Sequence, residues 1–392
     1  MMRRACALAS AMLACCAASH AGQAGAPWAT SLELEAGLRA PQPGGRRPTR
    51  LSADVSWEYQ ASADWRFKLA DRFEHFGGAQ RRTVNTLKDA YLSWNASAES
   101  AIDIGRVNLR QGVAAGYNPS DYFRARAVRS VVSVDPETLR RSRSGAYLVQ
   151  GQRVWDGGSV SAVLAPRIGA DDDGGNTNAR ARALLVGSVR LAPDFQPQAL
   201  LLVEEGEAAQ LGLNLSTLLG DALTAHAEWS GGRQRDLLSR ALGRQDGRGG
   251  RAWRNRLAAG ATYTAGNRMS FTAEFHWCGA ALDKAQWADL ARQSGQYWAY
   301  RDFVRREQEP PTRKGLFGML VWPDALRPRL DLSAVAKHDL QDRSSLLWSE
   351  ARWRLDEVDL ALQWTHVRGG AWDQYAAHGE RNSWRLLAQW YL

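Results

Sequence analysis

Apolar and polar residues alternate with a period of two along most of this chain. In residues 51–60 the apolar positions Leu51, Ala53, Val55, Trp57 and Tyr59 alternate with polar ones, and residues 269–278 and 358–365 repeat the pattern. A β-strand with one apolar face and one polar face produces this period, because successive side chains point to opposite sides of a sheet.

Eighteen segments of the chain are predicted to be strands. Most have 9–13 residues and are therefore longer than the five or six residues of a usual strand. A soluble β-sandwich also alternates, so the period alone does not decide the fold. The predicted strands are 29–39, 50–60, 63–73, 84–95, 100–110, 145–155, 159–168, 179–191, 197–206, 208–217, 221–230, 251–264, 268–278, 315–322, 328–338, 345–355, 357–367 and 382–392.

The connections between these segments alternate between short and long. The short ones are 61–62, 95–99, 156–158, 192–196, 218–221, 265–267 and 356–357, and the long ones are 40–49, 74–83, 111–144, 169–178, 231–250, 279–314 and 368–381. Short turns at one rim and long loops at the other are typical of outer-membrane β-barrels. We therefore predict an all-β fold, in which residues 27–392 form a single transmembrane antiparallel β-barrel of eighteen strands, sixteen being the alternative. The turns would be periplasmic and the long loops extracellular.

Two further patterns favour a barrel in the membrane. The longest uncharged apolar stretch, 315–323, is far shorter than the ~20 residues of a membrane-spanning helix. Aromatic residues gather where strands meet short turns, as in Trp57, Tyr59, Trp65 and Trp94. Rings with an apolar body and a polar edge are expected at the level of the lipid headgroups.

Residues 1–26 are predicted to be a secretory signal peptide. Arg3 and Arg4 precede an apolar stretch over 5–18, and Ala24-Gly25-Ala26 forms a small-residue cleavage site. Three of the four cysteines lie in this leader and only Cys278 follows it. The mature chain therefore has no internal disulfide, and its stability has another source.

Three short motifs resemble a known class of barrel. The last strand alternates up to Leu392 and looks like the carboxy-terminal insertion signal of Gram-negative outer-membrane barrels, although those commonly end in Phe or Trp. The run Asp89–Trp94, the pair Gly105-Arg106 and the motif Asn118-Pro119-Ser120-Asp121 resemble porin-like and alginate-export-like barrels. The resemblance implies an eighteen-strand channel in the cell outer membrane. Its partners would be outer-membrane lipid, lipopolysaccharide and, through the last strand, the barrel assembly machinery.

The charge of the chain favours anionic solutes. The net charge is +9, and only five of the 50 basic residues are lysines. These charges are spread along the chain, so they do not indicate a nucleic-acid surface. Arginine offers a fixed fork of donors to carboxylates and phosphates, and a positive lumen favours anions. The residues predicted to contact the solute are Arg124, Arg126, Arg129, Arg140, Arg141, Arg143, Arg182, Arg254 and Arg256.

Segment 111–144 is the strongest functional candidate, because long loops inside compact proteins are usually functional. It holds six of these arginines against the acids Asp121, Asp135 and Glu137. We expect it to fold into the barrel and narrow the pore. An outward loop whose arginines bind lipopolysaccharide phosphates is the alternative.

No pattern indicates an enzyme, a metal site or a cofactor site. The histidines lack metal-ligand spacing, and neither a nucleophile elbow nor a phosphate-binding glycine loop occurs. Two function classes remain: a channel for small, anionic solutes, and a barrel that exports or binds an acidic polysaccharide. Trp287, Tyr297, Trp298 and Tyr300 could stack on sugars, or could belong to a surface helix over about 281–307 whose rings pack on the barrel rim.

Overall fold

The computed structural model describes most of the chain. The described residues are 28–39, 49–77, 81–169, 176–243, 250–377 and 381–392. The predicted signal peptide, residues 1–26, lies outside the described residues.

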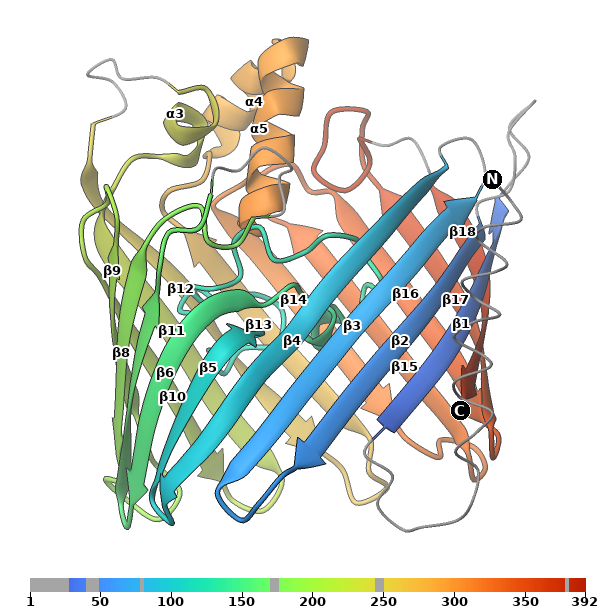
Figure 1. Cartoon of the computed structure of the whole chain (residues 1–392). Coiled ribbons are helices and arrows are strands. Elements are labelled where there is room, and N and C mark those ends of the chain that lie inside the picture. Colours follow the sequence, from blue (N-terminus) through green and yellow to red (C-terminus); the bar gives the residue numbers. More distant parts are fainter. Residues whose placement is uncertain (1–27, 40–48, 78–80, 170–175, 244–249, 378–380) are drawn as a thin grey trace.

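Eighteen strands form one closed antiparallel sheet (Figure 1). Each strand pairs with its neighbours in the chain, and β1 pairs with both β2 and β18, so the wall has no free edge. The predicted fold class and strand number are confirmed. The strands are β1 Trp28–Arg39, β2 Thr49–Gln60, β3 Trp65–Gly77, β4 Arg82–Ser97, β5 Ser100–Val107, β6 Ala146–Trp155, β7 Gly158–Ala165, β8 Arg182–Val189, β9 Gln198–Glu204, β10 Gln210–Leu219, β11 Leu223–Gln234, β12 Ala252–Thr264, β13 Ser270–Cys278, β14 Lys314–Trp322, β15 Leu330–Asp339, β16 Ser345–Arg354, β17 Val358–Arg368 and β18 Asn382–Tyr391.

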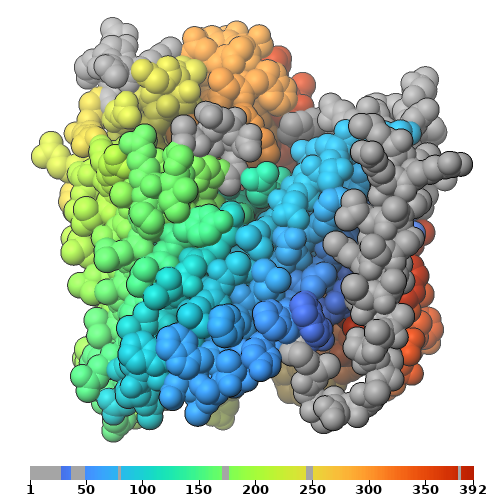
Figure 2. All heavy atoms as spheres, viewed as in Figure 1, coloured from blue at the N-terminus to red at the C-terminus, as the bar shows by residue number. Residues whose placement is uncertain are grey.

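The alternating sequence gives the wall an apolar outside and a polar inside. On β13, Thr272 and Glu274 face inward and are buried, whereas Phe271 and Phe275 face outward and are exposed. Figure 2 shows the outer surface of β2–β4, blue to cyan, as an unbroken front of side chains. Because the barrel is closed, each strand forms backbone hydrogen bonds with a neighbour on both sides. Lipid requires this, since it offers no hydrogen-bond partner to a free strand edge.

Aromatic rings stack along the outside of the wall near the short turns. Trp28 packs on Trp57 with ring centroids 5.2 Å apart, and Trp65 packs on Trp94 at 5.8 Å. Trp364 and Trp384 form a similar pair, at 6.0 Å, toward the other rim. The two stacked pairs at the short turns lie where the sequence predicts aromatic residues, and the rings of Trp364 and Trp384 are tilted by 34° to each other.

The connections follow the predicted rhythm with three exceptions, all at the rim of the long loops. The connections from β9 to β10 and from β15 to β16 are short, with residues 205–209 and 340–344. The predicted long loop 74–83 is much shorter, because β3 continues to Gly77 and β4 begins at Arg82. Helices α3 Leu237–Ala241, α4 Lys284–Ala291 and α5 Ser294–Glu307 lie above the rim with the long loops (Figure 1). None of the described helices is long and apolar enough to cross a membrane.

The connection from β5 to β6, residues 108–145, lies inside the barrel (Figure 1). It is mostly irregular and contains the short helix α2 Pro136–Arg141, which Asp135 caps by accepting a hydrogen bond from the Thr138 amide at 2.8 Å. We call this connection the inner segment.

A closed barrel predicts a simple behaviour in detergent. Protein extracted from membranes should migrate faster on a gel before boiling than after it, because a wall without edges resists unfolding by detergent. Its far-ultraviolet circular dichroism should be that of a strand-rich protein, whereas a helix-rich spectrum would contradict the fold.

Candidate functional site in the barrel lumen

The inner segment leaves the wall and returns to it at two glycines. Gly105, near the end of β5, has a φ of 138°, and a Cβ there would lie 2.8 Å from the Cα of Tyr91. At the return, a Cβ on Gly145 would lie 2.8 Å from the carbonyl carbon of Val107. Both positions therefore require glycine, because a side chain would collide with backbone atoms.

Glu228 on β11 holds the first half of the inner segment. Its carboxylate accepts hydrogen bonds from the amides of Val113, Ala114 and Ser120 at 3.0, 3.2 and 2.7 Å, and from the Ser120 hydroxyl at 2.9 Å. The side chain of Glu228 is fully buried. A buried carboxylate is stable only when such donors replace its water. Gly112 allows this approach, because a Cβ there would lie 2.5 Å from the carboxylate.

Glu274 on β13 holds the next residues in the same way. It accepts hydrogen bonds from the amides of Ala115 and Gly116 at 2.6 and 2.9 Å. The Nε2 atoms of His226 and His276 lie 2.9 and 2.8 Å from the two carboxylate oxygens. Two neighbouring carboxylates thus bind four consecutive backbone amides, which fixes the path of residues 113–116.

The second half of the inner segment reaches the wall formed by β1–β3. The Ser130 hydroxyl donates to Glu74, and Arg50 donates to the Val132 carbonyl at 3.2 Å. Arg50 also forms ion pairs with Glu33 and Glu35 at 2.9 and 2.6 Å. The segment therefore spans the lumen from β11 and β13 to β2 and β3.

Apolar contacts fill two sectors of the lumen between these anchors. Tyr122 and Phe123 pack on inward residues of β6–β9 such as Leu148 and Leu184. Ala115 and Val134 pack on a second group, formed by Phe317, Val335 and Trp348 of β14–β16. In these sectors the inner wall is apolar because it faces the segment and not water.

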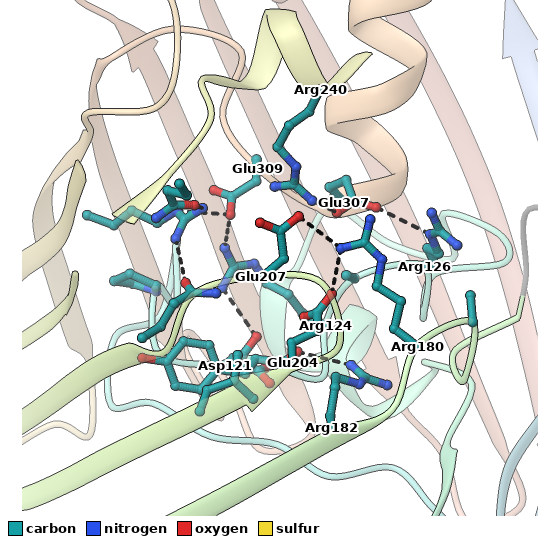
Figure 3. A pocket seen from close by; sticks show the side chains of 18 of the residues that line it. Asp121, Arg124, Arg126, Arg180, Arg182, Glu204, Glu207, Arg240, Glu307 and Glu309 are labelled. Carbon is teal, nitrogen blue, oxygen red and sulfur yellow. Dashed lines mark hydrogen bonds and ion pairs between the residues drawn. The ribbon is translucent and has the colours of Figure 1, made fainter. Parts of the chain in front are cut away.

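A cavity of about 240 Å³ lies between the inner segment, α3, α5 and the strand ends of β8–β12 (Figure 3). Eight arginines and five acids line it, so positive charge is in excess. The arginines are Arg124, Arg126, Arg180, Arg182, Arg233, Arg235, Arg240 and Arg256, and the acids are Asp121, Glu204, Glu207, Glu307 and Glu309.

Ion pairs neutralise much of this charge. Glu309 lies between Arg124 at 2.6 Å and Arg256 at 3.2 Å. Glu307 binds Arg240 at 2.9 Å and Arg126 at 3.3 Å, and Arg180 reaches both Glu204 and Glu207 at 3.1 Å. Glu307 is the last residue of α5 and Glu309 follows two residues later, so they tie that helix to the inner segment.

Burial and charge act against each other at Glu309. Burial alone would raise the pKa of its carboxyl, but Arg124 and Arg256 hold that pKa below its ordinary value. The Tyr117 hydroxyl donates to the same carboxylate at 2.7 Å, and burial raises the pKa of Tyr117 well above its ordinary value. Glu309 is therefore ionised and Tyr117 neutral across the physiological range.

Four of the nine predicted solute-contacting arginines line the cavity. Arg124 and Arg256 share Glu309, and Arg126 binds Glu307. Arg182 instead donates to the carbonyls of Tyr122, at 3.2 Å, and Thr177, and lies 4.2 Å from the centre of the Phe123 ring.

The other five arginines lie elsewhere. Arg143 is 2% exposed and bound to Asp121 at 2.9 Å, so it cannot meet a solute as predicted. Arg140 and Arg254 bind backbone carbonyls, at 2.9 and 3.2 Å. Arg129 and Arg141 are exposed, and Arg141 pairs with Glu137 at 2.8 Å.

Comparison with known proteins agrees with this architecture. No family model matches the chain, and no curated protein sequence matches it. Among solved structures it is similar to OccK8 (OprE) and OprD of Pseudomonas aeruginosa, both with a TM-score of 0.54, at 10% and 12% sequence identity. The similarity covers 93% of this chain and 98% and 94% of the other two chains. The chain has the fold of these barrels.

A third similar structure is OccAB1 of Acinetobacter baumannii, with a TM-score of 0.52, 12% identity and coverage of 95% of this chain and 98% of the other. The sequence resemblance to porin-like eighteen-strand barrels is thus confirmed at the level of the fold.

The anchoring carboxylate gives a first test of the inner segment. Glu228→Ala removes the acceptor of five hydrogen bonds, the fifth coming from the Asn118 side chain at 3.3 Å, and leaves their donors buried, at a cost of about 2–4 kcal/mol. Hydrogen exchange at the amides of Val113, Ala114 and Ser120 should accelerate by roughly 30-fold or more. Glu58→Ala is the matched control and should leave these amides protected. Glu58 is an inward acid whose side chain is 50% exposed and whose only ion-pair partner among the described residues is Arg66. Unchanged exchange in Glu228→Ala would contradict the anchoring role.

A second test uses pH. Because the folded pKa of Glu309 is lowered, its stabilising contribution is complete above the unfolded value of about 4.3 and is lost as pH falls through the folded value. Glu309→Gln leaves two buried arginines without their counterion and should cost about 3–5 kcal/mol at pH 7. The difference in Tm from the parent should be constant from about pH 8 to 5 and shrink below about pH 4. Glu99→Gln, which breaks an exposed pair with Arg153, should change Tm little at any pH. A difference that does not depend on pH would refute the role of the Glu309 charge.

Proposed function

We propose that the protein is an outer-membrane channel that passes small anionic solutes, and that the inner segment is its constriction. The observation that carries the proposal is the path of this segment, which crosses the lumen between anchors on β11 and β13 and anchors on β2 and β3. A wall of eighteen strands encloses a wide lumen, so a segment across it sets the narrowest passage.

Solvent-exposed arginines beside the constriction support anion preference. The side chains of Arg141 and Arg110 are 71% and 41% exposed although they lie on the inner segment, so water-filled space remains next to α2. Arg129 is also exposed, and it forms no ion pair within the described part of the chain. These groups and the positive excess around the cavity attract anions, and the lower dielectric of a narrow passage strengthens the effect.

Burial of three aromatic side chains weighs against the polysaccharide alternative. Helices α4 and α5 bury three of the four aromatic side chains named in the sequence analysis, as expected for a surface helix that packs on the barrel rim. The exposed fractions are 3% for Trp287, 0% for Tyr297 and 0% for Tyr300, and Trp298 alone of these four keeps an exposed ring. Sugar stacking needs accessible ring faces, so we retain small solutes as the cargo. A channel needs neither a catalytic group nor a cofactor.

The apolar outer wall and its girdles suit outer-membrane lipid and lipopolysaccharide as surroundings. β18, which closes the barrel against β1, is the strand through which we propose recognition by the barrel assembly machinery.

Selectivity should depend on the exposed arginines of the inner segment. In planar bilayers under a salt gradient, the parent protein should show a reversal potential whose sign indicates that anions pass more readily than cations. Arg129→Glu with Arg141→Glu should abolish or invert that preference without loss of the folded barrel, because four units of charge change inside the lumen.

Arg292→Glu with Arg305→Glu is the matched control, since these arginines are 75% and 66% exposed on and beside the outer helices. It should leave the reversal potential close to that of the parent. Cation preference in the parent, or equal effects of both double variants, would contradict the proposed function.

A further inference from the structure

The outer wall carries charge at mid-height only on β3 and β5. On the other described strands, the outward residues at this level are uncharged. Their direction follows from the alternation with inward neighbours that are buried. Examples are Leu34, Val55, Val149, Ala162, Leu185, Leu201, Leu213, Ala227, Ala259, Ala273, Gly318, Ala334, Ser349, Leu362 and Ala388. Asp71 and Arg106 break this rule, and their strands are separated by β4 alone.

Asp71 faces outward on β3, between Leu69 and Phe73. Its inward neighbours Ala70 and Arg72 are buried in the lumen, at 5% and 8% exposure, which fixes the direction of the Asp71 side chain. One carboxylate oxygen accepts from Asn85 of β4 at 2.8 Å, and the other is shielded from solvent without a hydrogen-bond partner in the described chain. No cation among the described residues forms an ion pair with the Asp71 carboxylate, so its charge is not neutralised within the described chain.

Arg106 faces outward on β5, opposite Ala90 of β4 and Tyr147 of β6. It donates to the Gly145 carbonyl at 3.1 Å and the Ser144 hydroxyl at 2.6 Å, and its guanidinium lies 5.1 Å from the centre of the exposed Tyr147 ring. It thereby covers the wall where the inner segment returns, and its charge has no carboxylate partner among the described residues.

The two charges lie at nearly the same height. Asp71 is six residues above Trp65 of the girdle, and a strand tilted by about 40° climbs about 2.5 Å per residue, which gives about 15 Å. Ile102 pairs with Trp94, which pairs with Trp65, and Arg106 is four residues above Ile102. These four residues give about 10 Å, and the moves from β3 to β4 and from β4 to β5 each add about 3 Å of height. Arg106 therefore also lies about 16 Å above Trp65. Both charges are therefore near the middle of the lipid-facing band.

We propose that this face, formed by Asp71, Asn85, Ala90 and Arg106 on β3–β5, binds the same face of a second copy of this chain. Charged side chains facing lipid at mid-depth are unfavourable, whereas a partner that supplies the opposite charge satisfies them. The exposed rings of Phe73 and Tyr147 on either side add apolar area to the contact.

Symmetry favours a second copy as the occupant. Two copies inserted in the same direction are related by a two-fold axis along the membrane normal, and this rotation leaves heights unchanged. Asp71 of one copy can therefore meet Arg106 of the other, and both pairs form at once. The axis then passes midway between the two residues, next to Leu87 and Ala90, which pair with Asp71 and Arg106 respectively. Lipid offers no such matched pair of charges.

A cysteine close to the predicted axis tests the contact. Ala90→Cys in intact membranes should give a disulfide-linked dimer on mild oxidation. Ala273→Cys is the matched control, because Ala273 faces outward on β13, nine strands from β4 and so on the opposite side of the barrel. The native Cys278 is fully buried and should not react. Crosslinking of Ala90→Cys at least 10-fold above Ala273→Cys is the expected result. Equal crosslinking at both positions, or none at either, overturns the proposal.

Asp71→Leu in the Ala90→Cys background tests the ion pair. Leucine suits the outer face, so the barrel should fold and keep its gel shift, while crosslinking should fall by at least fivefold. If Asp71→Leu left crosslinking unchanged, Asp71 would not hold the dimer and the proposal would fail. The readout needs no transported solute, so it stands or falls independently of conductance and selectivity.

Discussion

The arrangement of the lumen depends on two buried carboxylates that accept hydrogen bonds from backbone amides. Glu228 and Glu274 project from β11 and β13 and receive the amides of residues 113–116 and of Ser120. These amides belong to irregular chain with no strand to pair with, and buried donors without acceptors are costly. The carboxylates need the amides equally, because their own charge has lost its water. Each group thus makes the burial of the other possible.

The fixed path of residues 113–120 sets the positions of the next residues in the chain. Tyr122 and Phe123 reach the apolar wall of β6–β9, and Arg124 and Arg126 reach the end of α5. The Arg126 amide also donates to the Arg306 carbonyl at 2.6 Å, where Arg126 has a φ of 62°. Displacing the anchored residues would therefore disturb the cavity and the helical cap together.

The strands of the wall can be predicted from the sequence, because the alternation of apolar and polar residues depends only on neighbouring residues of one strand. Alternation identifies all eighteen strands, and its parity places Glu228, Glu274 and Arg256 on the inner face. The alternation does not reveal which side chains contact each other, and here the hydrogen-bonded partners are far apart in the sequence. Ser120 and Glu228 are separated by 108 residues, and Arg124 and Glu309 by 185. The role of Glu307 and Glu309 is missed for this reason, since they lie at and just after the end of a helix and carry no strand pattern. Arg143 is misjudged because a count of charges does not reveal that Asp121 neutralises it.

Compensation of charge explains how a lumen with so many arginines can fold. Arg50 and Arg72 share Glu33 and Glu74 on one wall, and Arg124 and Arg256 share Glu309 on the other. Paired in this way, the arginines stabilise the wall and the inner segment and contribute little net field. In the channel that we propose, the field at a mobile ion comes from the few cations with no buried acid beside them among the described residues, such as Arg129 and Arg141. In the proposed channel, selectivity and stability therefore reside in different arginines. The charge of the passage can then change without loss of the ion pairs that hold the segment across the lumen.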